Sequence, residues 1–535
     1  MIEKKQITEK NITGEKRSAG GRTGAAAIIK KTVGLIVFLA VLGFVFSRVT
    51  YLFRNTDQNR YRVAGIKSEP DNVDMVYIGG SVAFGYWQPL KAFKDCGFTS
   101  YNLATETISV ESILPFIKYT EKYKDPELYV IDARPFQYHK KMPLEAGLRN
   151  ASDSLDVTFL PRYEMINDYF MNRNVDESDD ISAYYFDIAK YHTNYANLGS
   201  EDAWKLMNNT CESSRNFFKG YVFFEPWCYL KHPEDFKTDE RKELLYSAEK
   251  DLEEILDYCK KKGLKVLLTV CPYSVTREEY SQYNTIEDIA GKYGAGFINT
   301  NDYYEEMGLD FSKDFSDFYH VNVFGAEKYT QFLENYIMEN YSLALPDPDS
   351  LDASWTQAQE SFAQYGDTVK ENIEKLIEEA RQGVEKGKLI RNTVSFSDWA
   401  GYVKDYRYSL LTAGDGTVLA QCSADDVFTL EYLGYDFAGI SGNDRYVSII
   451  SDPVNENEIP QPKNGVLKAE VGQSRYKSDV LISDDEGQAS IIIDDEECSC
   501  QDPEGVNVVV FDNYYRTLID SVTLKTVNGN IIIQR

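Results

Sequence analysis

A serine, an aspartate and a histidine stand in sequence contexts where they could form an activated nucleophile. Ser81 follows an apolar run and two glycines in "DMVYIGGSVAFGYWQP" (residues 74–89). The chain has only four histidines, and His320 lies in "DFSDFYHVNVFGAEKY", three residues after Asp317. A carboxylate at this spacing can reach His Nδ1 and leave Nε2 to accept a proton. With a serine hydroxyl beside it, such a pair would support acyl transfer.

The pattern of strands and helices around these residues predicts that Ser81, Asp317 and His320 lie close together in the fold. Apolar runs of strand length alternate with helical patterns, at 75–80, 98–104, 127–133, 263–273 and 295–300. This alternation predicts an α/β fold with a parallel sheet covered on both faces, and such sheets bind ligands at the carboxyl ends of their strands. Ser81 follows the first run, while Asp317 and His320 follow the fifth. Taken without Ser81, Asp317 is better explained as the cap of the helix that follows.

Composition divides the chain into segments, because 535 residues exceed one hydrophobic core. The α/β domain spans 70–344, and residues 140–240 form an insertion too long for a loop, which we expect to be a mostly helical cap. A helical linker is predicted at 351–391. From 392 to 535 short strands alternate with turns, which predicts a small β-sandwich-like domain. We interpret "YSLLTA", "VFTLEYLG", "YVSIIS", "GVNVVVFDN" and "DSVTLKTVNG" as its strands.

The N-terminal segment has the charge pattern and apolar run of a membrane anchor. Residues 1–31 carry eight Lys/Arg and three Glu, an excess of +5, so the remainder of a chain with net charge −28 sits at −33. A run of 16 residues without charge then ends at Arg48, and the span 32–54 reaches across a bilayer if Arg48 snorkels. The run is not amphipathic, unlike a core helix, and no small-x-small cleavage site follows it. We predict an uncleaved signal anchor, with the basic tail in the cytoplasm and the rest of the chain outside.

Several classes of function are disfavoured. The acidic balance argues against nucleic acid, which needs clustered Lys and Arg. The eight cysteines include no C-x-x-C pair, and their spacing leaves disulfides or buried thiols open. The acidic clusters at 484–486 and 494–497 lack EF-hand spacing. We therefore predict neither a metal site nor a cofactor.

The motifs resemble those of the SGNH hydrolase family, also called GDSL-type esterases. "VYIGGSVAFG" is similar to the family's serine block, "YNLATETISVES" to its second block, and "DFYH" to its Asp-x-x-His block. The resemblance covers residues 70–340 and implies a three-layer, flavodoxin-like fold. It assigns Ser81 as the nucleophile, His320 as the base and Asp317 as the residue that orients the base.

The oxyanion donors depart from this family's pattern. The family uses the serine N–H, a glycine N–H in the second block and an asparagine in the third. Here Thr107 stands in the second block, and "DARPFQYHK" offers Arg134 but no asparagine. The candidate donors are therefore Gly80, Thr107 and Arg134. The structural alternative for Arg134 is that it only pairs with Asp132 or with the cap. Loss of one such donor typically lowers the rate by about 10²–10³-fold.

A membrane anchor, a large insertion and an altered third block resemble the SGNH proteins that modify cell-envelope polymers. These include the alginate-type O-acetylation and teichoic-acid D-alanylation proteins, which often act beside a membrane-bound O-acyltransferase. The resemblance implies an extracytoplasmic serine O-acyltransferase or esterase acting on an envelope polysaccharide or a teichoic-acid-like polymer. The alternative is a non-catalytic envelope scaffold or glycan-binding protein with the same fold. Transfer and hydrolysis share an acyl-enzyme, so the residues leave that choice open.

Overall fold

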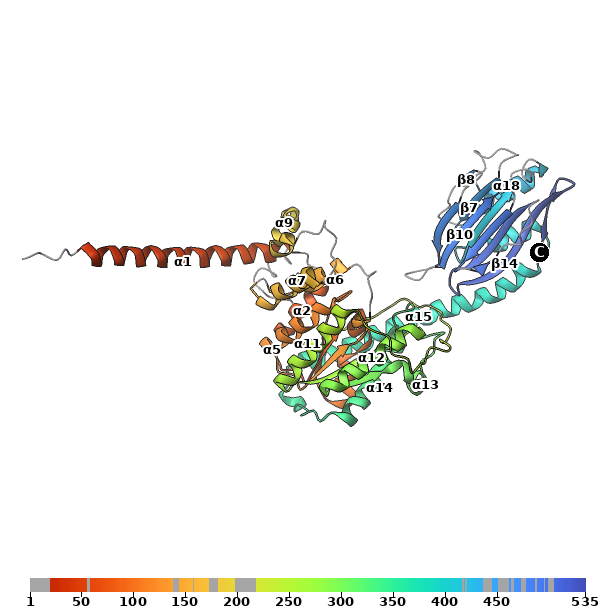
Figure 1. Cartoon of the computed structure of the whole chain (residues 1–535). Helices are drawn as coiled ribbons and strands as arrows, with labels where there is room; N and C mark the ends of the chain where they lie inside the picture. The colour runs from red at the N-terminus through yellow and green to blue at the C-terminus, as the bar shows by residue number, and fades with distance from the viewer. Residues whose placement is uncertain are drawn as a thin grey trace, which may run out of the picture.

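The chain forms an N-terminal helix, an α/β domain and a C-terminal β-rich domain (Figure 1). The computed structural model describes residues 20–54, 58–137, 144–156, 158–172, 181–197, 218–415, 418, 421–435, 445–450, 461–462, 466–472, 478–485, 488–494, 496–498 and 505–535. Residues 1–19 of the predicted basic tail lie outside these ranges, as do Cys211 and Cys500. The six described cysteines are free thiols.

The α/β domain is built on one parallel sheet, as predicted. Its five strands run in the order β2-β1-β3-β4-β5, which is the order of flavodoxin-like doubly wound sheets. Register pairs such as Gly79↔Ala104 and Asp132↔Thr269 bring the carboxyl ends of β1 to β4 to one edge. The strands are β1 (Met75–Gly79), β2 (Ser100–Ala104), β3 (Leu128–Asp132), β4 (Lys265–Val270) and β5 (Gly296–Asn299).

Helices follow the strands and end where the sequence supplies caps. Gly263 closes α11 in the left-handed conformation, with φ at 72°, which glycine adopts without strain. A capping box between Thr276 and Glu279 opens α12. The main helices are α3 (Ser81–Tyr86), α4 (Pro89–Cys96), α5 (Ile113–Tyr123), α11 (Tyr246–Lys262), α12 (Arg277–Tyr293) and α14 (Val323–Asn340).

Among the described residues of the insertion, those between 144 and 197 are mostly helical and those from 218 to 240 are not. Its helices are α6 (Leu144–Ser152), α7 (Leu160–Asn172), α8 (Ser182–Tyr185) and α9 (Asp187–Tyr191). Residues 221–245 contain no helix, so the expectation of a mostly helical cap is wrong there. Pro226 and Pro233 disfavour a helix in this segment. Its backbone instead forms hydrogen bonds with another segment: Cys228 N–H donates to Phe315 O and Leu230 N–H to Phe311 O, both at 2.9 Å.

A long helix, α15 (Ser354–Asn392), leads from the α/β domain to the C-terminal domain. It does more than connect them, because Trp355, Val369 and Ile373 are buried in the core of the α/β domain. The expected linker is thus partly a structural layer of that domain.

The C-terminal domain has two antiparallel sheets, of order β15-β14-β13-β6-β7-β8 and β12-β11-β10-β9. Leu411 and Val447 of the first sheet share a core with Val480 and Ile491 of the second, so the sheets pack face to face. The main strands are β6 (Tyr408–Asp415), β7 (Arg445–Ile450), β9 (Val466–Val471), β10 (Ser478–Asp485), β11 (Gln488–Ile493), β13 (Val506–Asp512), β14 (Thr517–Val527) and β15 (Asn530–Gln534). The short strands are β8 (Gln461–Pro462) and β12 (Glu496–Glu497).

One predicted strand of this domain is wrong. "VFTLEYLG" belongs to the helix α18 (Ala424–Leu433), which packs with α16 (Phe396–Val403) on the outer face of the larger sheet. Ser423 caps its first turn by accepting a bond from Asp426 N–H, and Gly434 ends it at φ 108°. These caps decide the outcome, because an apolar run this short fits either a strand or a helix.

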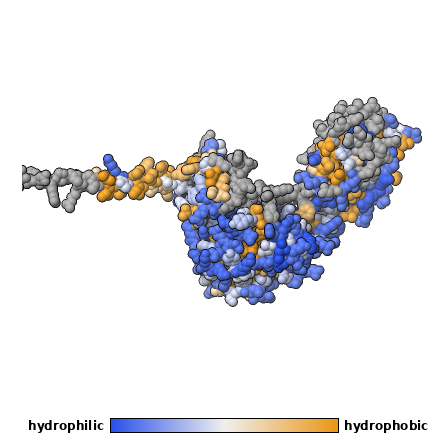
Figure 2. All heavy atoms as spheres, in the orientation of Figure 1, coloured by the Kyte–Doolittle hydropathy of each residue, from blue (hydrophilic) through white to orange (hydrophobic). Residues whose placement is uncertain are grey.

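The N-terminal helix α1 (Gly20–Phe53) projects from the α/β domain (Figure 1). Residues Ala27–Thr50 are long and apolar enough to cross a membrane: 24 residues rise about 36 Å, against about 30 Å of hydrocarbon. Figure 2 shows this apolar surface uncovered along the helix. The helix is therefore a candidate membrane span.

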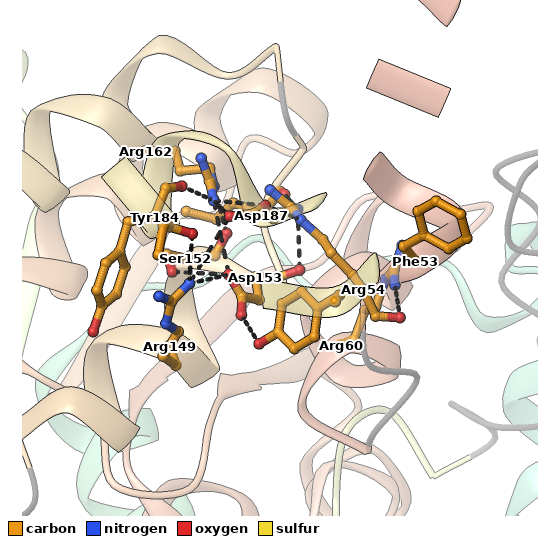
Figure 3. Close-up of polar contacts among 12 residues, drawn as sticks. Phe53, Arg54, Arg60, Arg149, Ser152, Asp153, Arg162, Tyr184 and Asp187 are labelled. Carbon is orange, nitrogen blue, oxygen red and sulfur yellow. Dashed lines mark hydrogen bonds and ion pairs between the residues drawn. The ribbon is translucent and has the colours of Figure 1, made fainter. Parts of the chain in front are cut away.

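A buried ionic cluster joins the end of α1 to the insertion (Figure 3). Arg54 Nε donates to Asp187 Oδ2 at 2.6 Å, and Arg162 Nη2 lies 2.9 Å from both carboxylate oxygens of Asp187. Arg54 also donates to the carbonyls of Asp153 and Leu155. The C-terminal end of α1 is thus fixed to the domain that follows.

Candidate active site

Ser81 stands at the turn between β1 and α3, at the carboxyl edge of the sheet. A Cβ on Gly79 would lie 2.6 Å from Asp132 Cβ and 2.9 Å from Ala83 Cβ, so only glycine fits where β1 passes β3. Gly80 has an ordinary φ of −84°, and a Cβ there would meet nothing closer than 3.7 Å. Gly79 is therefore the glycine that lets the strand deliver Ser81 close to Asp132.

The structure brings Ser81, His320 and Asp317 together. Ser81 Oγ lies 2.6 Å from His320 Nε2. His320 Nδ1 lies 2.9 Å and 3.0 Å from the two carboxylate oxygens of Asp317. With Nδ1–H donating to Asp317, Nε2 can accept a hydrogen bond from the Ser81 hydroxyl.

Asp317 serves His320 rather than the helix that follows. Asn322 caps α14, because its side chain accepts a hydrogen bond from Phe324 N–H at 3.0 Å. Burial opposes ionisation of Asp317, but its hydrogen bond and charge interaction with His320 and the N–H groups of Tyr319 and His320 outweigh it. The pKa of Asp317 is lowered, which keeps it a carboxylate at neutral pH.

A buried tyrosine holds the loop that carries these residues. Tyr86 Oη, on α3, lies 2.9 Å from Tyr319 O and 3.0 Å from Pro272 O, and it accepts a hydrogen bond from Val321 N–H at 3.1 Å. Ser81 and Tyr86 lie on the same short helix. The helix that presents the hydroxyl therefore also anchors the loop that presents the imidazole.

Ser81 and His320 border a cavity of about 270 Å³, and Asp317 lies behind His320, outside its lining. The lining combines the apolar side chains of Val82, Ile108 and Pro135 with a few polar and charged groups, as in sites that orient small substrates. Its lining residues are Gly80, Ser81, Val82, Thr107, Ile108, Asp132, Arg134, Pro135, Tyr319 and His320. All three candidate oxyanion residues thus lie at the site.

Gly80 and Arg134 make hydrogen bonds within the protein, and Thr107 has a strained backbone conformation. Thr107 has a φ of 52°, the left-handed conformation in which a β-branched residue is strained and glycine is not. Arg134 Nη1 donates to Tyr319 O at 3.0 Å, and its guanidinium lies 4.3 Å from the ring centre of Tyr273. The backbone of Gly80 hydrogen-bonds to the Asp132 carboxyl, so this N–H is used within the protein.

Two further residues belong to the site but were not predicted as site residues from the sequence. Asp132 ends β3 and lines the cavity, and burial raises its pKa despite the opposing effects of Arg134 and the backbone bonds. Its place at the carboxyl end of the third strand was the available signal. Phe224, from the irregular part of the insertion, packs edge to face on His320 with ring centres 5.1 Å apart, and nothing in the sequence indicated it.

Within the described ranges, no group of three or more His, Cys, Asp or Glu side chains is arranged to hold a metal ion. No protein-family model matches the chain. Comparison with curated proteins finds no significant relative.

Proposed function

We propose that this chain is a membrane-anchored, extracytoplasmic serine O-acyltransferase or esterase of the SGNH type that acts on a cell-envelope polysaccharide. The observation that carries the proposal is the 2.6 Å contact between Ser81 Oγ and His320 Nε2, with Asp317 on the other ring nitrogen. General-base catalysis needs this contact at about 2.6–3.2 Å. The five-stranded parallel sheet in flavodoxin-like order supports the family assignment.

The reaction follows from these three side chains. Ser81 Oγ attacks the carbonyl carbon of an ester while its proton passes to His320 Nε2. The tetrahedral intermediate collapses, the C–O bond to the leaving alcohol breaks, and the imidazolium returns the proton to that alcohol. A water or a sugar hydroxyl then attacks the acyl-serine while His320 Nε2 takes its proton. The bond between the acyl carbon and Ser81 Oγ breaks, and the imidazolium returns the proton to Ser81 Oγ.

The oxyanion would lie near Thr107, Arg134 and the N–H of Ser81. Ser81 is the first residue of α3, so its N–H has no acceptor within that helix. The guanidinium of Arg134, which lines the same cavity, supplies positive charge. Arg134 has five N–H donors, and its contact with Tyr319 O orients the group toward the loop.

The candidate span in α1 supports attachment to a membrane. The excess of Lys and Arg in residues 1–31 favours a cytoplasmic N-terminus, with the α/β domain outside. The acceptor polymer would be an envelope polysaccharide or a teichoic-acid-like polymer, and a membrane-bound O-acyltransferase is the proposed acyl donor.

The test is covalent labelling of the detergent-solubilised full chain with a fluorophosphonate probe. Ser81 Oγ forms a bond to phosphorus, fluoride leaves, and the adduct is located by mass spectrometry. We expect labelling of the wild type, none of Ser81→Ala, and normal labelling of Ser312→Ala, which removes an exposed serine. An unlabelled wild type, or a Ser81→Ala protein that labels equally, contradicts the proposal.

A non-catalytic scaffold is the second candidate, and one observation favours it. Arg134 Nη1 and the Gly80 backbone both bond within the protein, so two expected donors are already engaged. A scaffold predicts that cells carrying Ser81→Ala keep normal polymer acylation, whereas cells lacking residues 392–535 lose it. The enzyme predicts loss of acylation with Ser81→Ala.

A further inference from the structure

The turn between β13 and β14 reaches from the C-terminal domain to the α/β domain. Tyr515, in this turn, packs edge to face on Tyr229, with ring centres 5.1 Å apart, and on Trp227 at 6.0 Å. The next residue, Arg516, places its guanidinium 5.2 Å from the ring centre of Phe318. Phe318 lies directly between Asp317 and His320 in sequence.

Both contacts act on the loop of residues 315–321, which carries the catalytic histidine. Arg516 touches this loop through Phe318. Tyr515 touches the segment 227–229, which is itself bonded to the loop through Cys228 N–H and Phe315 O. Phe315 in turn forms a bridge with Val321, beside His320. One turn of the C-terminal domain therefore contacts this loop directly, through Phe318, and indirectly, through the neighbouring segment 227–229.

Arg516 is held in place by its own domain. Its Nη2 donates to Asp494 Oδ2 at 3.0 Å, and its Nε and Nη2 lie 3.2 Å and 3.1 Å from Ser478 Oγ. Its backbone adopts a φ of 51°, an uncommon conformation for a side-chain-bearing residue, and one that surrounding contacts must maintain. The second sheet, through Ser478 and Asp494, thus aims the guanidinium at Phe318.

The base of the turn is fixed to α15. Arg407 Nη2 donates to Asp512 Oδ2 at 2.6 Å and to Ala380 O at 2.7 Å. Gly383 makes room, since a Cβ there would lie 1.9 Å from Arg407 Cζ. Asp512 also accepts hydrogen bonds from Tyr514 and Tyr515 N–H, at 2.8 Å and 3.1 Å. The turn is therefore a rigid projection.

We infer that Tyr515 and Arg516 are positioning residues, through which the C-terminal domain sets the orientation of His320 toward Ser81. The inference rests on the proposed function, because it gives the domain a role in that same site. The loop consists of turns and single bridges, so its geometry depends on such external contacts. A shift of about 1 Å at a catalytic group can lower a rate about 10²-fold.

The test compares full-length Arg516→Ala with Arg445→Ala. Arg445 pairs with Asp484 at 2.6 Å between the two sheets, so its loss perturbs the same domain without touching Phe318. Hydrogen–deuterium exchange of the peptide covering 315–322 reports on the loop independently of catalysis, because several of its amides are hydrogen-bonded. Turnover of p-nitrophenyl acetate gives kcat and KM.

We expect Arg516→Ala to speed hydrogen–deuterium exchange in residues 315–322. It should lower kcat about three- to tenfold and leave KM almost unchanged, because a loosened loop displaces His320 by less than 1 Å. Arg445→Ala should leave both at wild-type values. In a Phe318→Ala background the Arg516 substitution should add nothing, since its partner is already gone.

The two proposals fail in different ways. A wild type that neither labels nor turns over ester contradicts the proposed function, whatever the exchange shows. An active wild type whose exchange and kcat are unaffected by Arg516→Ala contradicts the positioning role. An Arg445→Ala protein that matches Arg516→Ala in both measurements also contradicts it, since the effect would then be general loosening of the domain.

Discussion

Ser81 Oγ and His320 Nε2 lie 2.6 Å apart, although 239 residues separate them in the chain. Ser81 is delivered by the end of β1, and His320 by the loop before α14. Tyr86 links these two segments, because it lies on α3 with Ser81 and hydrogen-bonds to the backbone on both sides of His320. The contact therefore depends on the packing of α3 against this loop.

Replacing Asp317 by Asn should abolish most ester turnover while leaving the fold intact. The amide would donate rather than accept at His320 Nδ1, which favours the tautomer with Nε2 protonated, and this nitrogen then cannot take the serine proton. We expect kcat to fall by about 10³–10⁴-fold. Asp310→Asn, at an exposed position seven residues earlier, should be active. A kcat within tenfold of the wild type for Asp317→Asn contradicts the assigned role.

The same substitution should change the pH dependence of stability. Because the folded-state pKa of Asp317 is lowered, the carboxylate stabilises the fold above the ordinary carboxyl pKa of about 4. This contribution is lost as the pH falls through the lower folded-state value. The wild type should therefore exceed Asp317→Asn in free energy of unfolding by more at pH 7 than at pH 3, measured by urea titration. An equal difference at both pH values is the contrary result.

Glu334 should make the folded protein less stable as the pH rises from 4.5 to 7, because its ionisation is disfavoured in the folded state. Burial raises its pKa to about 7, against the opposing attraction of Lys91, so the folded state holds a proton that the unfolded state has lost. Glu334→Gln removes this effect and should raise the free energy of unfolding at pH 8 by about 1–3 kcal/mol. At pH 4 the two proteins should be nearly equal. A Glu334→Gln protein that is less stable at pH 8 contradicts this assignment.

Replacing Thr107 by glycine should stabilise the folded protein. Its φ of 52° strains a β-branched side chain by about 1–3 kcal/mol, whereas glycine adds less than about 1 kcal/mol of chain entropy to the unfolded state. We expect Thr107→Gly to gain about 1 kcal/mol in chemical denaturation and to retain fluorophosphonate labelling. Thr105→Gly, at a buried position without positive φ, should destabilise the chain. Destabilisation by Thr107→Gly as well would show that the threonine side chain matters more than the strain.

Removing Asp187 should loosen the junction between α1 and the insertion. Asp187 is the shared partner of the buried guanidiniums of Arg54 and Arg162, and its loss leaves buried charge uncompensated (Figure 3). Asp187→Ala should lower the free energy of unfolding by about 3–5 kcal/mol. Asp288→Ala breaks the exposed pair with Arg241 and should leave the free energy of unfolding almost unchanged, because water screens that pair. Similar effects of the two variants would contradict the role of burial.

The sequence by itself determined the parallel sheet, most helix ends and the candidate nucleophile and its partners. Alternating strand and helix patterns are local signals, and the carboxyl ends of parallel strands share an edge, so Ser81 and His320 could be placed near one another without coordinates. Where the local signal was ambiguous, as in the apolar run of α18, the caps at Ser423 and Gly434 decided the helix.

Tertiary structure alone decided how the site is supported. The direction of Arg134 toward Tyr319 O, the closeness of Asp132 to Gly79, the left-handed Thr107 and the packing of Phe224 on His320 all depend on which distant segments pack together. The contact of Arg516 with Phe318 joins residues of two domains that no periodicity relates. Periodicity and caps act within a few residues, whereas the orientation of a side chain is set by neighbours hundreds of residues away, and only packing selects those.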